Sequence, residues 1–147
     1  MKIKALTISQ PYASLIGEKW CENRSWNTNY RGWLAIHAGK GTQYLTKAEL
    51  TAYPTGCVIK IARLAACVSK QSINAFDRST HLIPGTSKTW LEAAQHPHCE
   101  GPFCLILEDI RDLTEPLIIN GKQGLWDLPE PLESTDFLAS YLGVNHG

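Results

Sequence analysis

The sequence predicts an α+β fold, a small mixed β-barrel with helices on its flank. Two observations favour this class. Short apolar runs rich in β-branched residues outnumber the helical patterns, and the helices interrupt the strands without the regular βαβ alternation of a parallel sheet. The chain has 147 residues, of which 44% are hydrophobic. This length suits one compact domain and this composition supplies a core. We therefore expect a single domain over residues 1–147.

The N-terminal part is expected to form a strand, a helix and a second strand. Residues 4–9 are β-rich and are followed by Gln10 and Pro11, which end the strand. Pro11 suits the first turn of a helix over residues 12–16, because a helix leaves its first N–H groups unpaired in any case. Residues 33–37 are apolar and β-rich, which predicts the second strand.

The middle of the chain is expected to contain two short helices and two long strands. Thr46 and Glu49 have the spacing of a capping box, which predicts a helix over residues 46–53. Thr89 or Ser87 is expected to cap a second short helix. Continuous apolar runs predict buried strands at residues 56–69 and 103–110.

The C-terminal part is expected to add a strand, a turn and a helix. Residues 116–120 indicate another strand, and the glycines of residues 121–126 indicate a turn that presents Trp126. Ser134 is expected to cap a final helix that ends near Leu142.

Positive charge is concentrated near the N-terminus, although the whole chain has a formal net charge of zero. Residues 1–40 hold six basic and two acidic side chains, a net charge of +4, and the remaining 107 residues carry −4. A protein that coats long nucleic acid is usually basic throughout, because its affinity comes from many phosphate contacts. This balance favours a small anionic ligand or a short stretch of nucleic acid.

The candidate site lies in residues 17–33, which contain three of the five tryptophans. On an extended chain, one face would carry Lys19, Cys21, Asn23 and Ser25, and the other Trp20, Glu22, Arg24 and Trp26. Lys19 and Arg24 suit a phosphate or carboxylate. Trp20, Trp26 or Trp126 can stack on a base, and Glu22 and Asn23 can contact its polar edges. The alternative is structural: Lys19, Glu22 and Arg24 form ion pairs that fix a strand, and the tryptophans fill the core.

The cysteines and histidines predict neither a disulfide framework nor a metal site. Five cysteines at irregular spacing, with no Cys-x-x-Cys pair, indicate reduced thiols. His96, His98, Cys99 and Cys104, with His81 as a further candidate, match no zinc spacing. His37 lies within an apolar strand, where a hydrogen-bonded structural role is commoner than a ligand-binding one. We therefore expect no metal and no cofactor.

Hydropathy predicts a cytoplasmic protein with no membrane partner. No apolar run approaches the 18 residues of a membrane-spanning helix, and the N-terminus has no signal-peptide hydrophobic region.

Three stretches of the sequence resemble the ASCH domain family. They are Leu6-Thr-Ile-Ser-Gln-Pro-Tyr-Ala-Ser-Leu-Ile16, Gly17-x-Lys19-x-x-Glu22-x-Arg24-Ser-Trp26 and Tyr30-Arg-Gly-Trp-Leu-Ala-Ile-His-Ala38. The likeness continues at residues 53–56, 101–102 and 121–126. It therefore spans about residues 3–128.

The resemblance implies a PUA-like β-barrel that binds RNA or DNA in a cleft between the barrel and its helices. Carried over to this sequence, Lys19 and Arg24 line that cleft, and Glu22 and Ser25 lie beside them. The expected partner is RNA or a single nucleotide or nucleoside, with DNA as a possible alternative. Arg31 is expected to assist Lys19 and Arg24 in holding phosphate, and Trp26 or Trp126 to stack on a base.

Two other classes of function stay open at this point. One bacterial ASCH branch resembles an amidohydrolase of N(4)-acetylcytidine, and another member resembles a ribonuclease. The amidohydrolase motif has a Thr nucleophile where this chain has Glu22, so Lys19 and Glu22 would instead act as acid and base on a bound water. The third class is a protein-interaction module, which an exposed apolar patch of tryptophans would favour.

Overall fold

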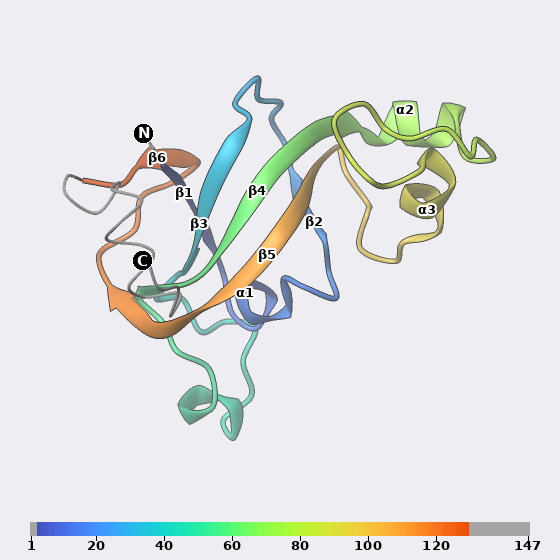
Figure 1. The fold of residues 1–147 in the computed structure, drawn as a ribbon. Coiled ribbons are helices and arrows are strands. Elements are labelled where there is room, and N and C mark those ends of the chain that lie inside the picture. The colour runs from blue at the N-terminus through green and yellow to red at the C-terminus, as the bar shows by residue number, and fades with distance from the viewer. Residues whose placement is uncertain (1–2, 130–147) are drawn as a thin grey trace. The chain divides into compact units, whose positions relative to one another are not determined.

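Six strands dominate residues 3–129, the residues that the computed structural model describes. The strands are β1 (Lys4–Ile8), β2 (Cys21–Arg24), β3 (Gly32–Ala38), β4 (Cys57–Ser69), β5 (Phe103–Ile118) and β6 (Leu125–Asp127). They hydrogen-bond in the order β2-β5-β4-β3-β1-β6 (Figure 1). The helices are short: α1 (Tyr12–Leu15), the 3-10 turn η1 (Glu49–Thr51), α2 (Lys70–Ala75) and α3 (Trp90–Gln95). Strands with a few short helices confirm the predicted α+β class. None of the helices in residues 3–129 has the length and apolar character needed to cross a membrane.

The described chain divides into two compact units. Unit 1 contains residues 3–17, 33–62 and 109–129, and unit 2 contains residues 18–32 and 63–108. The long strands β4 and β5 each contribute one part to unit 1 and the other part to unit 2.

Unit 1 is built on a mixed sheet. β1 pairs with β3 in parallel, with Leu6 opposite Ile36, and with β6 in antiparallel orientation, with Ala5 opposite Trp126. The sheet buries a cluster of apolar side chains: Ile3, Ala5, Ala35, Val58, Ile61, Leu113, Leu117, Trp126 and Leu128. Removal of this apolar area from water is the main favourable contribution to the stability of the unit.

The Gln10-Pro11 pair joins β1 to α1 as the sequence predicts. Pro11 is the N-cap of α1, and Gln10 is fully buried. The Gln10 side chain accepts a hydrogen bond from the Ser14 backbone N–H at 3.0 Å and donates one to the Pro54 carbonyl at 2.8 Å. These bonds satisfy a buried amide and hold the start of α1 to the chain at residue 54.

His37 has a structural role in unit 1, which confirms the prediction. The side chain is buried, with Nδ1 3.2 Å from Thr7 Oγ1 and Nε2 2.7 Å from the Ile119 carbonyl oxygen. The Trp126 indole packs edge-on against the imidazole and donates its N–H to Thr7 Oγ1 at 3.1 Å. Both ring nitrogens of His37 are therefore engaged within the core.

Substitution of Gly121 by Ala is expected to lower the free energy of unfolding by about 1–3 kcal/mol, the usual range for overpacking. A Cβ atom at Gly121 would lie 2.6 Å from both His37 Cε1 and Thr7 Oγ1, so both hydrogen-bonded side chains would have to shift. Urea unfolding followed by tryptophan fluorescence measures the effect. Gly41→Ala is the control, because a Cβ there meets only the end of the exposed Gln43 side chain. Equal unfolding free energies for the two variants would contradict the prediction.

Unit 2 is built from β2, the adjoining parts of β4 and β5, and the helices α2 and α3. β2 pairs antiparallel with β5, with Glu22 opposite Leu105. α2 and α3 lie next to each other beyond the end of β4 (Figure 1). The Thr89 hydroxyl and the Glu92 side chain form a reciprocal capping box, which confirms Thr89 as the cap of α3. The buried cluster of this unit contains Cys21, Ala66, Ile73, Ile83, Ala93, Cys99, Cys104 and Ile106.

Several predicted elements need correction. Thr46 and Glu49 do bond reciprocally, but only η1 follows, because the segment buries no side chain that would stabilise a longer helix. Residues 116–120 do not form a separate strand, since β5 continues to Ile118. The sequence analysis also missed α2, whose N-cap is Ser69. The predicted helix from Ser134 to Leu142 lies outside the described residues.

Candidate functional site

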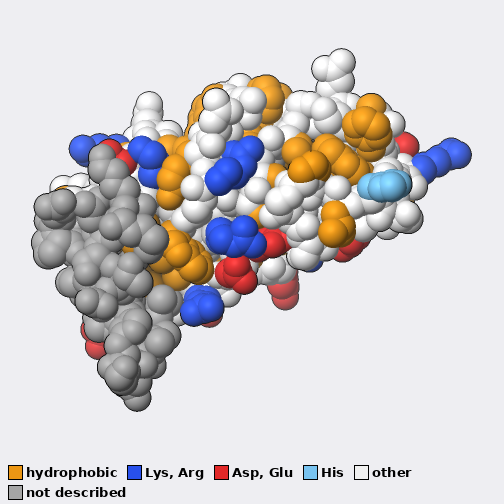
Figure 2. Space-filling view, turned by 45° about the horizontal axis from the view of Figure 1, so that its top comes forward, with side chains coloured by type: hydrophobic (Ala, Val, Ile, Leu, Met, Phe, Trp, Pro, Cys, Tyr) orange, Lys and Arg blue, Asp and Glu red, His pale blue; other side chains and the backbone are white. Residues whose placement is uncertain are grey.

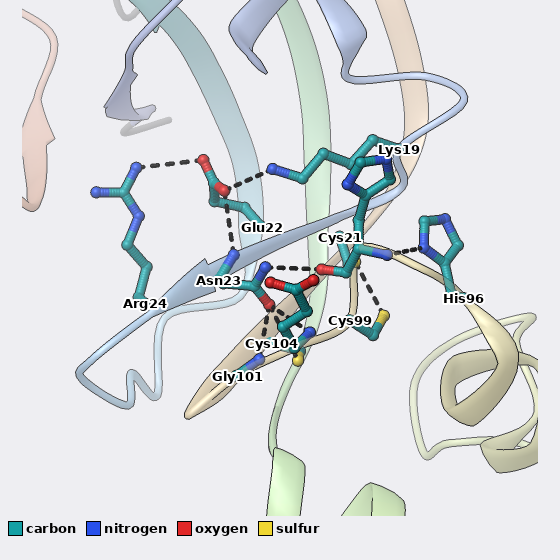
Figure 3. Close-up of polar contacts among 11 residues, drawn as sticks. Lys19, Cys21, Glu22, Asn23, Arg24, His96, Cys99, Gly101 and Cys104 are labelled. Atoms are coloured by element: carbon teal, nitrogen blue, oxygen red, sulfur yellow. Dashed lines mark hydrogen bonds and ion pairs between the residues drawn. The ribbon is translucent and has the colours of Figure 1, made fainter. Parts of the chain in front are cut away.

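Lys19, Glu22 and Arg24 come together in unit 2, as the ASCH-like motif predicts. Both cationic side chains point toward Glu22, which lies between them (Figure 3). Lys19 Nζ donates to Glu22 Oε1 at 2.8 Å, and Arg24 Nη2 lies 3.4 Å from Glu22 Oε2. The Asn23 backbone N–H also donates to Glu22 Oε1, at 3.1 Å. We call these three charged residues the motif triad.

The alternation of faces expected around Lys19 is wrong. It placed Lys19 and Glu22 on opposite faces of a strand, whereas the two side chains form an ion pair. β2 begins only at Cys21, so the two-residue period does not extend back to Lys19. Within β2 the period holds: Glu22 extends from one side of the strand, and Cys21 and Asn23 extend from the other (Figure 3).

The motif triad carries excess positive charge in a site shielded from water. The exposed fractions of the side chains are 6% for Lys19, 9% for Glu22 and 22% for Arg24. Two cations against one carboxylate leave one positive charge in excess. Removing such charges from water is costly, and pairing restores only part of that free energy. The motif triad therefore favours the approach of an anion. Arg24 is the most exposed member of the triad.

The other predicted residues of the motif region follow β2. Ser25 and Arg31 are exposed and Trp26 is half-buried. One guanidinium nitrogen of Arg31 donates to the carbonyl oxygens of Thr28 and Tyr30, at 2.9 and 2.7 Å. These bonds hold the Arg31 side chain against its own loop, at the surface of unit 2.

Two tryptophans considered for stacking are engaged elsewhere. Trp126 belongs to unit 1, where it is 6% exposed and packs in the core, so the turn does not present it. Trp20 is half-buried in unit 2, with its ring edge-on to His96 at a centroid distance of 4.5 Å. Lys88 Nζ lies 5.0 Å from the centroid of the Trp20 ring. Trp26 thus stays the candidate for stacking on a base.

Asn23 holds a loop rather than reading a base edge. Its Nδ2 donates to the His98 carbonyl at 2.7 Å, and its Oδ1 accepts from the backbone N–H groups of Glu100 and Gly101 at 3.0 and 2.9 Å (Figure 3). This fixes residues 98–101 against β2. The sequence marks Asn23 as a candidate because it lies within the motif. It does not predict the hydrogen-bond partners of Asn23, because they lie 75 to 78 residues away in the chain.

The same side of β2 carries a cluster of metal-ligand types that combines His96 and Cys99, which the sequence analysis weighed, with Cys21, which it did not. One ligand atom each from Cys21, His96 and Cys99 lies within 4.8 Å of the others. A hydrogen bond with Cys104 lowers the pKa of the Cys99 thiol, but the hydrogen bond with Cys21 and burial outweigh it and raise that pKa to about 12. Burial lowers the pKa of His96. These two shifts disfavour the thiolate form of Cys99 and the charged form of His96.

Comparison with known proteins identifies the fold. No family model matches the chain. Among curated proteins, Activating signal cointegrator 1 from Homo sapiens is 26% identical over an alignment that covers 84% of this chain and 22% of that protein. The chain thus corresponds to about a fifth of the length of this relative.

The structural match covers nearly the whole chain. The crystal structure of ASCH from Zymomonas mobilis matches with a TM-score of 0.55 and 19% identity, over 95% of this chain and 94% of that one. A single-residue variant of the same protein matches with a TM-score of 0.54 and 20% identity, over 95% of each chain. At this identity the likeness concerns the fold. The chain therefore has the fold of ASCH structures, which is α+β and PUA-like, and this confirms the resemblance predicted from its motifs.

Proposed function

We propose that this protein binds RNA or a single nucleotide through the motif triad of unit 2. The observation that carries the proposal is the grouping of two cations, Lys19 and Arg24, around the one carboxylate of Glu22, with Arg24 as the most exposed of the three side chains. In this proposal Arg24 contacts phosphate, and Lys19, which is more deeply buried, adds a positive charge that attracts it. Glu22 accepts a hydrogen bond from a base amino group or a sugar hydroxyl.

The geometry of Arg24 supports a role in ligand binding. Its 3.4 Å contact with Glu22 is longer than the roughly 2.7–3.2 Å of a strong N–H···O bond. A phosphate matches the planar fork of a guanidinium, which suits the Arg24 side chain to a phosphate contact. Exposed Arg31 and Ser25 and half-buried Trp26 follow Arg24 in the chain, and we assign them supporting phosphate contacts, hydrogen bonding and base stacking.

The distribution of charge over the surface supports a short ligand. On the face shown in Figure 2, Lys and Arg side chains lie next to Asp and Glu side chains near the centre of the view. A surface that tracks a long phosphate backbone would instead be basic along its length. The proposed partners are therefore short single-stranded RNA or a nucleotide, with DNA of the same sequence as a comparison.

The affinity of short single-stranded RNA for the wild type and its variants tests this function. We expect Arg24→Ala and Lys19→Ala each to weaken binding about 10- to 100-fold, as loss of a charged hydrogen bond of about 1.5–3 kcal/mol implies. Arg24→Lys should fall between the wild type and Arg24→Ala, because it keeps the charge but loses the bidentate fork. Fluorescence anisotropy with labelled RNA, labelled DNA and competing nucleoside monophosphates gives the affinities.

Arg78→Ala is the matched control, since Arg78 is an exposed arginine of the same unit outside the motif. It should bind RNA as tightly as the wild type does. The thermal midpoint of each variant separates loss of binding from loss of folding. Equal affinity of the wild type and a folded Lys19→Ala, Arg24→Ala double variant would refute the proposal.

The second candidate function is hydrolysis of a modified nucleoside or of RNA. It is favoured by one observation: Lys19 and Glu22 form a buried pair at 2.8 Å, a separation suited to proton transfer between an acid and a base. In this reading the pair would activate a water molecule near the bound ligand. Incubation with N(4)-acetylcytidine and with RNA tests for turnover. Product that forms with the wild type but not with Glu22→Gln, under conditions where the thermal midpoint shows that the variant is folded, would support an enzyme. Binding without product would indicate a binding module.

A further inference from the structure

A cluster of two thiols and one imidazole lies on the side of β2 opposite Glu22. The Sγ atoms of Cys21 and Cys99 are 2.9 Å apart, and a ring nitrogen of His96 lies within 4.8 Å of both. Cys21 and Cys99 are buried, whereas His96 is half-buried and gives the cluster a side open to solvent. Figure 3 shows the three residues around one point, with the motif triad on the other side of the strand.

Three separate features of unit 2 bring these side chains together. Cys21 is the first residue of β2, and its side chain faces the buried cluster of the unit. His96 is the C-cap residue of α3, and Cys99 follows it three residues later in the chain. Asn23, two residues beyond Cys21 on the same side of β2, holds this loop through the His98 carbonyl and the Gly101 N–H. The loop is therefore fixed against the strand by bonds that do not involve the cluster itself.

The hydrogen bonds of His96 leave it in a form that can bind a metal. Nδ1 accepts a hydrogen bond from the His98 backbone N–H at 3.0 Å, so Nδ1 carries no proton, and a metal bound there would replace this hydrogen bond. Nε2 lies 3.4 Å from the Glu18 carbonyl oxygen, to which its proton points. A metal-binding histidine usually donates its other N–H to such a carbonyl.

We propose that Cys21, Cys99 and His96 bind one thiophilic divalent cation, of which Zn²⁺ is the best match. Two thiolates, one imidazole and one Zn²⁺ sum to zero charge, which suits a site among the apolar side chains of this unit. Cys104 lies on β5, and its thiol forms a hydrogen bond with the thiol of Cys99. The Cys104 thiol also contacts Asn23 Oδ1 at 3.5 Å. Cys104 is therefore one candidate for the fourth ligand, and a water molecule is another.

Binding the ion has a defined proton balance and a defined structural consequence. Each cysteine loses its thiol proton to solvent, so one cation releases two protons, or three if Cys104 also coordinates. When the metal takes His96 Nδ1, the His98 backbone N–H loses this acceptor and donates to water or another group instead. With Zn–S bonds of about 2.3 Å in a tetrahedral site, the two sulfur atoms would separate to about 3.8 Å. The loop of residues 98–101 would therefore move slightly away from β2.

Titration of the reduced, chelator-treated full chain with Co²⁺ and with Zn²⁺ tests the site. Co²⁺ bound by thiolates gives a charge-transfer absorption band, and tetrahedral coordination gives intense visible bands. We expect one Co²⁺ per chain, displacement of Co²⁺ by Zn²⁺, and release of two to three protons in weakly buffered solution. Zn²⁺ should also raise the thermal midpoint of the wild type.

Variants assign the ligands. Cys21→Ser, Cys99→Ser and His96→Gln should each weaken Co²⁺ binding at least tenfold, and the cysteine variants should lose part of the charge-transfer intensity. His96→Gln is the informative variant if a cysteine variant fails to fold, because His96 is half-buried and outside the apolar cluster. Cys57→Ser, a buried cysteine of unit 1, is the matched control and should bind as the wild type does. If Cys104→Ser releases one proton fewer than the wild type on metal binding, Cys104 is the fourth ligand.

Three results would overturn the proposal. The first is a folded wild type that gives no thiolate-to-cobalt band. The second is a band of equal intensity in His96→Gln, Cys57→Ser and the wild type together with unchanged affinity. The third is a Cys21–Cys99 disulfide that persists after treatment with reductant and blocks metal binding. None of these results depends on whether the motif triad binds RNA, so the two proposals are tested separately.

Discussion

Glu22→Gln is expected to lower the free energy of unfolding by about 3–5 kcal/mol, the usual cost of breaking a buried ion pair by neutralising one of its members. The substitution preserves the shape of the side chain but removes the only carboxylate of the motif triad. Lys19 and Arg24 are then two neighbouring cations with little access to water, since their side chains are 6% and 22% exposed. Urea unfolding at constant ionic strength measures the loss.

Asp112→Asn is the control for this prediction. Asp112 is also paired with a lysine, Lys60, at 3.1 Å, but its side chain is 77% exposed. An exposed ion pair contributes roughly 0–1 kcal/mol, so this variant should remain close to the wild type. If Glu22→Gln is no more destabilising than Asp112→Asn, the motif triad is not the buried, electrostatically coupled site that the account requires.

A double variant separates stability from function at the same place. Replacement of a buried ion pair by apolar residues of similar volume is often neutral or stabilising. Lys19→Met combined with Glu22→Leu should therefore be more stable than Glu22→Gln, yet bind RNA no better than Lys19→Ala. Such a result would indicate that the charges are kept for the ligand and not for the fold.

Asn23→Ala is expected to lower the free energy of unfolding by about 2–4 kcal/mol, because three hydrogen bonds of one side chain are lost together. The lost bonds are those to the His98 carbonyl and from the N–H groups of Glu100 and Gly101. Thermal unfolding measures the global effect. Hydrogen exchange at the amides of residues 100 and 101 measures the local effect and should accelerate strongly.

Asn27→Ala is the matched control for Asn23→Ala. The Asn27 side chain is exposed and accepts a single hydrogen bond, from the Thr28 backbone N–H at 2.8 Å. Its loss should change the free energy of unfolding by about 1 kcal/mol or less. A similar small effect for Asn23→Ala, with unchanged exchange at residues 100 and 101, would show that the loop is held by other contacts.

Strands β1, β3, β4 and the first half of β5 could be predicted because they carry strong local signals, whereas β6 lies where a turn was predicted. β4 and the first half of β5 are long apolar runs, and β1 and β3 are bounded by Gln10-Pro11 and by the turn-rich residues 27–32. The continuation of β5 to Ile118 could not be predicted, because most of its later residues are exposed and give no apolar pattern. Residues 46–53 show the opposite case, in which a good capping box lacks the packing that would extend a helix.

The candidate site was predicted only in part, for a physical reason. Residue types and spacing identified Lys19, Glu22 and Arg24, since an ion-pair network within six residues is a local property. The ion pairing of Lys19 with Glu22 was predicted only as the structural alternative, and the expected alternation of faces placed the two side chains apart, because that alternation depends on where β2 begins. The roles of Asn23 and Cys21 depend on residues 96–104, which reach β2 only through the fold. Contacts between residues so far apart in the chain follow no fixed spacing, so a single sequence does not predict them.

The dependence of RNA affinity on salt concentration tests the central claim most directly. If Arg24 contacts phosphate, log Kd of the wild type rises with log salt, and Arg24→Ala lowers that slope by about 0.7, the value for one phosphate contact on a single strand. The slope for Arg78→Ala should equal that of the wild type. A wild type whose affinity does not depend on salt, or a slope that Arg24→Ala leaves unchanged, would contradict the account.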